Sequence, residues 1–114
     1  MIDIEKLNEE SLCRLFDHTY LKAFGQDADF EKLCNEAREY HFAMVAINSG
    51  PVALCKKLLQ GSDVHVGAAI SFPLGQMSIQ GKYLEAQTAI NDGADEIDYV
   101  INIGKLIQGD LHYI

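Results

Sequence analysis

The sequence predicts an α/β protein built from repeated parallel βα units. Short strand-like runs alternate along the chain with longer helix-like stretches. The run from Phe42 to Asn48 is apolar at every position except the last, as expected for a strand that is covered on both faces. Strands that alternate with helices in this way form a parallel sheet joined by right-handed crossovers.

The first third of the chain predicts a helix, a strand and a second helix. Residues 2–15 have the apolar spacing of one helix face, and residues 17–21 are strand-like. Asp27 is the expected N-cap of the next helix, because acidic residues follow in its first turn and favour the helix dipole. This helix runs to about Tyr40, and its predicted buried stripe consists of Phe30, Leu33, Cys34 and Ala37.

Two further strand–helix units are predicted after it. Pro51 suits the first turn of a helix that ends near Gly61, and residues 63–72 are again strand-like. Ser78 is a suitable N-cap for a helix that closes before Gly93. The predicted apolar face of that helix is formed by Ile79, Tyr83, Ala86 and Ile90.

The run from Gly93 to Asn102 predicts a fourth strand with one acidic face. Ile97, Tyr99 and Ile101 lie on one side, and the other side carries Glu96, Asp98, Val100 and Asn102. A carboxylate is costly to bury unless it is paired, and acids near the carboxyl ends of parallel strands are candidates for catalysis. The segment alone leaves open a half-exposed antiparallel strand with an ordinary polar face.

Four βα units account for the chain as one domain over residues 1–114, and residues 106–114 are expected to start another helix. Two architectures fit this order: a small doubly wound sheet, or the first half of an eightfold βα barrel.

The composition argues against several classes of function. The formal net charge of −8 and the lack of a basic stripe argue against binding to nucleic acid. The apolar runs are too short to span a membrane, and the first residues lack the features of a signal peptide, so a cytoplasmic location is expected. Three cysteines without a paired spacing predict buried free thiols, namely Cys13, Cys34 and Cys55.

Three motifs carry a resemblance to a known family. They are Asp17-His18-Thr19-x-Leu21-Lys22, Phe72-Pro73-Leu74-Gly75, and the run from Gly93 to Asn102. Together, in this order and at these separations, they resemble the deoxyribose-phosphate aldolases, which are class I aldolases with a TIM-barrel fold. The resemblance covers essentially the whole chain, and it implies an N-terminal half-barrel that stops before strands 5–8.

The resemblance implies the reversible cleavage of 2-deoxyribose 5-phosphate to glyceraldehyde 3-phosphate and acetaldehyde. A lysine forms a Schiff base with the carbonyl partner, and no metal or other cofactor is needed. Asp98 is the implied catalytic acid, which relays protons through water during imine formation. The implied pocket-lining residues after the first strand are Asp17, Thr19 and Lys22.

Several other polar residues stand at positions that suggest a role. Asn48 and Asn102 lie at strand ends, where they could bind substrate or simply form turns. Asp95 and Glu96 are expected to cap or pair near the strand start, and His18 to contact the barrel floor or a neighbouring carboxylate. The scattered histidines have no ligand spacing, so no metal site is predicted.

In the family, the Schiff-base lysine lies on the sixth strand and its partner lysine on the seventh, so the resemblance does not place either in this chain. We therefore expect the isolated half to be inactive. Open strand edges favour pairing, which predicts a homo-oligomer or a partner that supplies the other half. The expected substrate of a completed barrel is a small phosphorylated sugar or aldehyde.

Two other readings remain. One is a non-catalytic half-barrel that serves as a binding or assembly module, which the absence of the lysine pair favours. The other is a receiver-like signalling domain of flavodoxin type. That domain needs paired acids after its first strand and a lysine after its last, and neither is evident.

Overall fold

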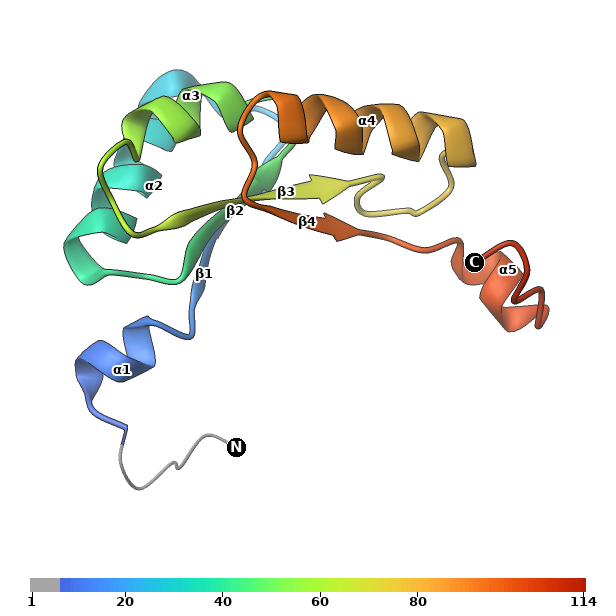
Figure 1. The fold of residues 1–114 in the computed structure, drawn as a ribbon, viewed down its shortest axis with the longest axis horizontal. Helices are drawn as coiled ribbons and strands as arrows, with labels where there is room; N and C mark the ends of the chain where they lie inside the picture. Colours follow the sequence, from blue (N-terminus) through green and yellow to red (C-terminus); the bar gives the residue numbers. More distant parts are fainter. Residues whose placement is uncertain (1–6) are drawn as a thin grey trace.

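The computed structural model describes residues 7–114 as a four-stranded parallel sheet with helices between the strands (Figure 1). The elements, in chain order, are α1 (Glu9–Cys13), β1 (Asp17–Tyr20), α2 (Asp27–Tyr40), β2 (Met44–Asn48), α3 (Val52–Leu58), β3 (His65–Ile70), α4 (Ile79–Asn91), β4 (Glu96–Tyr99) and α5 (Ile103–Ile107). The predicted α/β class and the four strands are confirmed. The predicted strand ranges are longer than the segments that pair.

The order of the strands in the sheet is the same as their order in the chain, β1-β2-β3-β4, and all three pairs are parallel. A doubly wound sheet instead reverses its strand order at a switch point. The observed order is that of consecutive strands in a βα barrel, and β1 and β4 are the two edges of the sheet.

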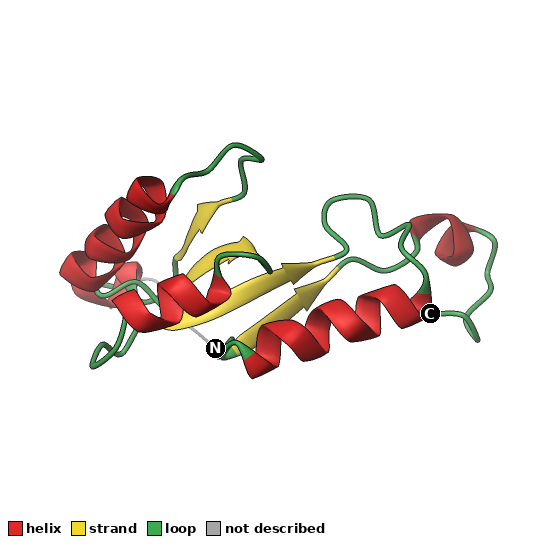
Figure 2. Ribbon diagram, turned by 90° about the horizontal axis from the view of Figure 1, so that it is seen from above, coloured by secondary structure: helices red, strands yellow, loops and turns green. Residues whose placement is uncertain are grey.

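Helices α2, α3 and α4 cover one face of the sheet, and they follow one another along it when seen from above (Figures 1 and 2). The side chains beneath them form the core. Val45, Ile47, Val66, Ala68 and Ile70 are completely buried there. Full burial of one large aliphatic side chain contributes about 1.5–3 kcal/mol, so this layer is the main source of stability.

The other face of the sheet is not covered by any element within residues 7–114, which corrects the expectation of strands buried on both faces. Thr19, Glu96 and Asp98 are exposed there. Helices α1 and α5 lie beyond the ends of β1 and β4 rather than over this face (Figure 1). The apolar character of β2 therefore reflects one covered face and a row of small or apolar side chains on the other.

Two terminal helices differ from the predictions. Helix α1 begins only after Asn8, whose side chain accepts a hydrogen bond from the Ser11 amide at 2.8 Å. The part of the prediction over residues 2–6 lies outside the described residues. Helix α5 begins after Asn102, which caps the Lys105 amide at 3.0 Å, and Gly109 follows its end with a φ of +75°. The expected helix over 106–114 was therefore wrong in position.

The predicted apolar face is buried in α2 but not in α4, where Ile79, Tyr83 and Ile90 are 59%, 58% and 57% exposed and the buried residue is Ala89. The stripe of α2 is buried as expected. Its N-cap is Gln26 rather than Asp27, because Gln26 shares a capping box with Asp29. Ser78 caps α4 as predicted, accepting from the Gly81 amide at 3.1 Å. Among the cysteines, Cys34 and Cys55 are buried, whereas Cys13 is half-buried on α1.

Candidate functional site

The uncovered face of the sheet carries an open groove of about 340 Å³. Small residues from the middle strands form its floor, including Ala46, Gly67 and Ala69. Asp17 and Thr19 line it from β1, and Asp98 lines it from β4. The small floor leaves room between the two edge strands, so the groove brings together polar residues that lie more than 75 positions apart in the chain.

Asp98 faces this groove because side chains alternate along a strand. Its register partner on β3 is Ala69, whose partner on β2 is Asn48. Ile97 points the other way and packs against the core. The predicted alternation is confirmed for Ile97 and Asp98, whereas Tyr99, predicted on the apolar face, is 60% exposed and borders the groove. Asn48 shares the face and level of Asp98.

Three carboxylates share this face. Burial raises the pKa of Asp17, and the negative charges of Glu96 and Asp98 raise it further. Glu96 is paired, since its carboxylate lies 2.7 Å from Nδ1 of His65. The Thr19 hydroxyl donates to the carbonyl of Asp17 at 2.8 Å. The groove is therefore an acidic environment that favours cationic groups, and its carboxyl groups can accept and return protons.

Lys22 lies outside the groove. Its Nζ sits 5.7 Å from the centre of the Tyr20 ring and 6.0 Å from that of Phe24, in a separate surface depression beside α2. Asn102 also lies elsewhere, because its side chain caps α5 and borders an apolar groove between α4 and β4. Of the residues expected to bind substrate, Asp17 and Thr19 line the groove with Asp98, and Asn48 lies on the same face.

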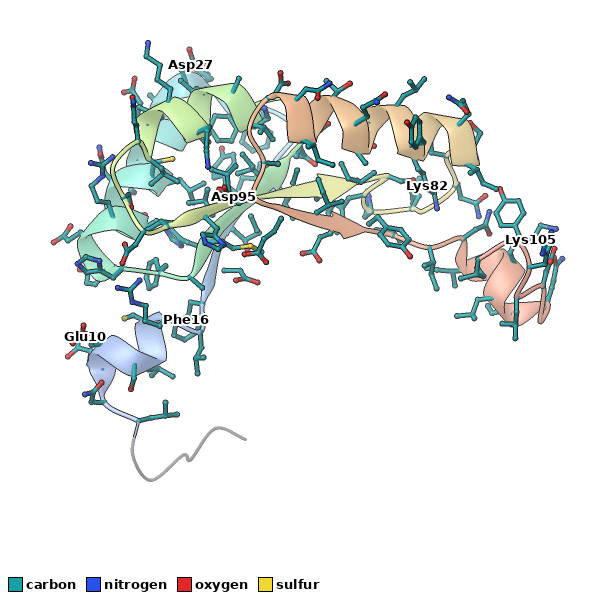
Figure 3. All side chains as sticks on the ribbon, in the orientation of Figure 1. Glu10, Phe16, Asp27, Lys82, Asp95 and Lys105 are labelled. Carbon is teal, nitrogen blue, oxygen red and sulfur yellow. The ribbon has the colours of Figure 1, made fainter. Side chains whose placement is uncertain are left out.

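The polar residues at the opposite, amino-terminal edge of the strands form pairs. Asp95 accepts from Nζ of Lys56 at 2.6 Å and from the Val66 amide at 2.9 Å. His18 contacts Glu36 at 2.8 Å. The structural roles expected for Asp95 and Glu96, and the carboxylate contact expected for His18, are as predicted (Figure 3 shows Asp95 where the sheet meets the helices).

Sequence reasoning missed two residues of α4 that contact the carboxyl ends of the strands. Lys82 donates to the carbonyl of Val100 at 2.6 Å and lies between α4 and the end of β4 (Figure 3). Glu85 accepts from the Ser49 hydroxyl and from the Ser71 amide, both at 2.8 Å. The signal available in the sequence was two charged residues three positions apart on a helix, which places them on one face.

The loop after β3 closes against the chain that leaves β4. Gly75 has a φ of +65°, and its backbone approaches the carbonyl of Ile101 closely. Phe72, in the same loop, lines the groove. The motif from Phe72 to Gly75 is therefore packed at the carboxyl-terminal edge of the strands, which is where βα-barrel enzymes in general carry their active sites.

Among residues 7–114, no lysine lines the groove. No group of three or more His, Cys, Asp or Glu side chains in that range is arranged to hold a metal ion. Within the same range, no helix is long and apolar enough to cross a membrane.

Comparison with known proteins supports this description. A family model for the DeoC/LacD family aldolases matches residues 12–110. The chain is 55% identical over 106 residues to a deoxyribose-phosphate aldolase of Bacteroides thetaiotaomicron, covering 93% of this chain and 44% of that protein. It is 50% identical over 109 residues to the enzyme of the same name from Lactobacillus acidophilus, covering 96% and 46%.

A solved structure shows the same arrangement. The tetrameric deoxyribose phosphate aldolase of Aeropyrum pernix matches with a TM-score of 0.83 at 29% identity, over 89% of this chain and 44% of that one. The four parallel βα units thus correspond to part of a TIM-barrel enzyme. The chain spans less than half the length of these relatives and matches their N-terminal part. The chain belongs to the DeoC/LacD family of aldolases.

Proposed function

We propose that this chain forms the N-terminal part of the active site of a deoxyribose-phosphate aldolase of class I, with Asp98 as its proton-relay acid. The reaction is the reversible cleavage of 2-deoxyribose 5-phosphate to glyceraldehyde 3-phosphate and acetaldehyde. The observation that carries the proposal is the position of Asp98, which lines the groove together with Asp17 and Thr19. The chain belongs to an aldolase family, which gives this position its meaning.

The chemistry of an imine explains why an acid is needed there. A lysine amine adds to the carbonyl carbon, and the carbinolamine then loses the former carbonyl oxygen as water. That oxygen must gain a proton before the C–O bond breaks, and the nitrogen must lose one. A carboxyl group on the open face can deliver and recover these protons through a water molecule.

The nucleophilic lysine comes from outside the described groove in this proposal. No lysine among residues 7–114 lines the groove, so a further segment or a second chain must present the amine to it. The acidic lining attracts the ammonium form of such a lysine, and a carboxylate of the groove can take the proton that the lysine must lose before it attacks. The same acids repel a phosphate, so the phosphate of the substrate binds away from Asp17 and Asp98.

A complementation experiment tests the proposal. The chain is mixed with the part of the Bacteroides thetaiotaomicron aldolase that follows the matched segment. 2-Deoxyribose 5-phosphate is added, acetaldehyde is measured, and borohydride traps any imine for mass spectrometry. We expect acetaldehyde release and a reduced adduct on the added part, with neither from the 114-residue chain alone. A mixture without acetaldehyde or adduct would refute the proposal, and an adduct on this chain would refute the external lysine.

Asp98→Asn tests the role of the acid in the same mixture. It keeps the shape of the side chain but removes its proton chemistry, so turnover should fall about 100-fold or more. Asp92→Asn, an exposed carboxylate at the end of α4, is the matched control and should keep full activity. If Asp98→Asn and the unmodified chain were equally active, Asp98 would not be part of the mechanism.

A second candidate function is a non-catalytic half-barrel that acts as a binding or assembly module. The uncovered sheet face and the two edge strands, β1 and β4, favour it. Unpaired edge strands are templates for pairing with another chain. Sedimentation velocity of the chain alone distinguishes this candidate: a self-associating species supports assembly, and a monomer at all concentrations contradicts it.

A further inference from the structure

The carboxylate of Glu85 connects two loops that flank the groove. One oxygen accepts from the hydroxyl of Ser49, the first residue after β2, at 2.8 Å. The other accepts from the amide of Ser71, the first residue after β3, at 2.8 Å. Glu85 itself is half-buried on α4. Both of its oxygens are therefore engaged, each with a different loop, at the carboxyl ends of two adjacent strands.

Ser71 has an unusual backbone at this point. Its φ is +55°, in the left-handed region that side chains other than glycine rarely adopt, and only 8% of the residue is exposed. Such a conformation persists only where the surroundings fix it. The amide that Glu85 accepts from belongs to this same residue, so Glu85 supplies one of the contacts that fix the turn.

Each residue that Glu85 holds is the chain neighbour of a residue on the open face. Asn48 precedes Ser49 and shares the face and level of Asp98 through the register of β2, β3 and β4. Phe72 follows Ser71 and lines the groove together with Asp98. A shift of either loop would move one of these two side chains relative to Asp98.

We infer that Glu85 is a positioning residue for the groove, which sets Asn48 and Phe72 relative to Asp98 without touching the substrate. Lys82 lies one helical turn away on α4 and donates to the carbonyl of Val100, so it fixes the chain at the end of β4 in the same way. Helix α4 thus fixes the ends of β2, β3 and β4 from one face. The effect on catalysis rests on the proposed aldolase function, whereas the effect on the geometry does not.

The chain offers a matched control for this inference. Asp95 makes the same kinds of contact, accepting from a side chain, Lys56, and from a backbone amide, Val66. It does so at the amino-terminal edge of the sheet, away from the groove. Asp95→Asn therefore reproduces the loss of a bridging carboxylate but leaves the loops around the groove in place.

The geometric test uses the full 114-residue chain labelled with ¹⁵N. Amide chemical shifts of Asn48 and Phe72, and the hydrogen exchange of the Ser71 amide, are compared between variants. Glu85→Gln should shift both amides and speed exchange at Ser71 at least tenfold, because one of the two acceptor oxygens becomes an NH2 group, which cannot accept a hydrogen bond. Asp95→Asn should leave these three signals in place. Ser49→Ala, which removes only one contact, should move Asn48 alone and provides a milder variant if Glu85→Gln does not fold.

The catalytic test uses the complemented mixture described above. Misplacement by about 1 Å can cost 100-fold in rate, so Glu85→Gln should lower kcat between about 10- and 100-fold while Asp95→Asn keeps it. Unchanged shifts at Asn48 and Phe72 in Glu85→Gln, or equal shifts in Asp95→Asn, would overturn the inference. If the unmodified mixture is inactive, the proposed function fails, and the amide shifts still decide the role of Glu85.

Discussion

The backbone carbonyl of Ile101 occupies the space that a Cβ atom would take on Gly75. The two residues belong to the loop after β3 and to the chain that leaves β4, and both segments border the groove region. Because the contact is between main chains, a side chain at Gly75 cannot be accommodated by a rotamer change. The close approach therefore makes the mutual position of these segments depend on glycine.

Gly75→Ala should destabilise the protein by about 3 kcal/mol, since it combines a left-handed backbone with an overpacked contact. Gly109→Ala is the matched control, because Gly109 also has a positive φ, of +75°, but open space around its Cβ position. Its expected loss is about 1 kcal/mol. Urea unfolding of both variants measures the difference, and equal losses would show that the contact with Ile101 is unimportant.

Asp95 should stabilise the fold in a pH-dependent way. Burial raises the pKa of Asp95, but the contacts with Lys56 and with the Val66 amide outweigh it and hold that pKa below the ordinary value of 3.8. The ionised form is thus favoured in the folded state. Its contribution is present above the pKa of the unfolded chain and is lost as the pH falls through the folded value.

Asp95→Asn should therefore lower the free energy of unfolding at pH 7 by about 1 kcal/mol, a value reduced from that of buried charged hydrogen bonds because the site is partly exposed. Near pH 2 the variant and the unmodified protein should unfold at the same urea concentration. A difference that persists unchanged at low pH would mean that the effect does not come from the ionised carboxylate.

Asp17 should have the opposite effect to Asp95, because its ionised form lowers the stability of the fold. Burial, Glu96 and Asp98 raise its pKa above 3.8, so the folded state favours the protonated form. The ionised form then costs stability above the folded pKa, and this cost is absent below the pKa of the unfolded chain. Asp17→Asn should stabilise the protein at pH 7 by less than about 1 kcal/mol, and the gain should disappear at low pH.

The interaction across the groove can be measured directly. An NMR titration of the Asp17 carboxyl should give a pKa above 3.8, and Asp98→Asn should lower that pKa. Asp92→Asn, remote from the groove, serves as the control and should leave it unchanged. If Asp98→Asn does not change the pKa of Asp17, the two carboxylates do not interact across the groove.

The three thiols should differ in reactivity. Cys34 and Cys55 are 1% and 0% exposed, and the contact with Cys34 together with burial raises the pKa of Cys55. Cys13 is half-buried on α1. Ellman's reagent at neutral pH should therefore modify one thiol rapidly in the folded protein and all three in urea. Cys13→Ser should abolish the rapid phase, and rapid modification of a second thiol would contradict the described core.

Much of the fold could be predicted because the helix-covered face leaves a local pattern. The stripe of Phe30, Leu33, Cys34 and Ala37 has helical spacing, and each of its members is buried. The alternation of Ile97 and Asp98 likewise follows from the period of a strand. These features depend on neighbours in the sequence, so periodicity is sufficient to find them.

The ends of the elements were less predictable because they depend on single hydrogen bonds. Helix α5 begins where Asn102 caps it, several residues before the apolar spacing suggested. The role of Glu85 could not be predicted from the sequence for a different reason. Its partners are 36 and 14 positions away, and only the assembled sheet brings the ends of β2 and β3 to one helix.

The strand order has a consequence for synthesis. Each strand pairs with the one that precedes it in the chain, so its partner already exists when it leaves the ribosome. The covered face can likewise be completed one helix at a time, as in repeat proteins whose units contact only their neighbours. A nascent chain of this kind can therefore grow its sheet vectorially. Among the four described strands, β4 with Asp98 joins last, at the edge where any later strand would be added.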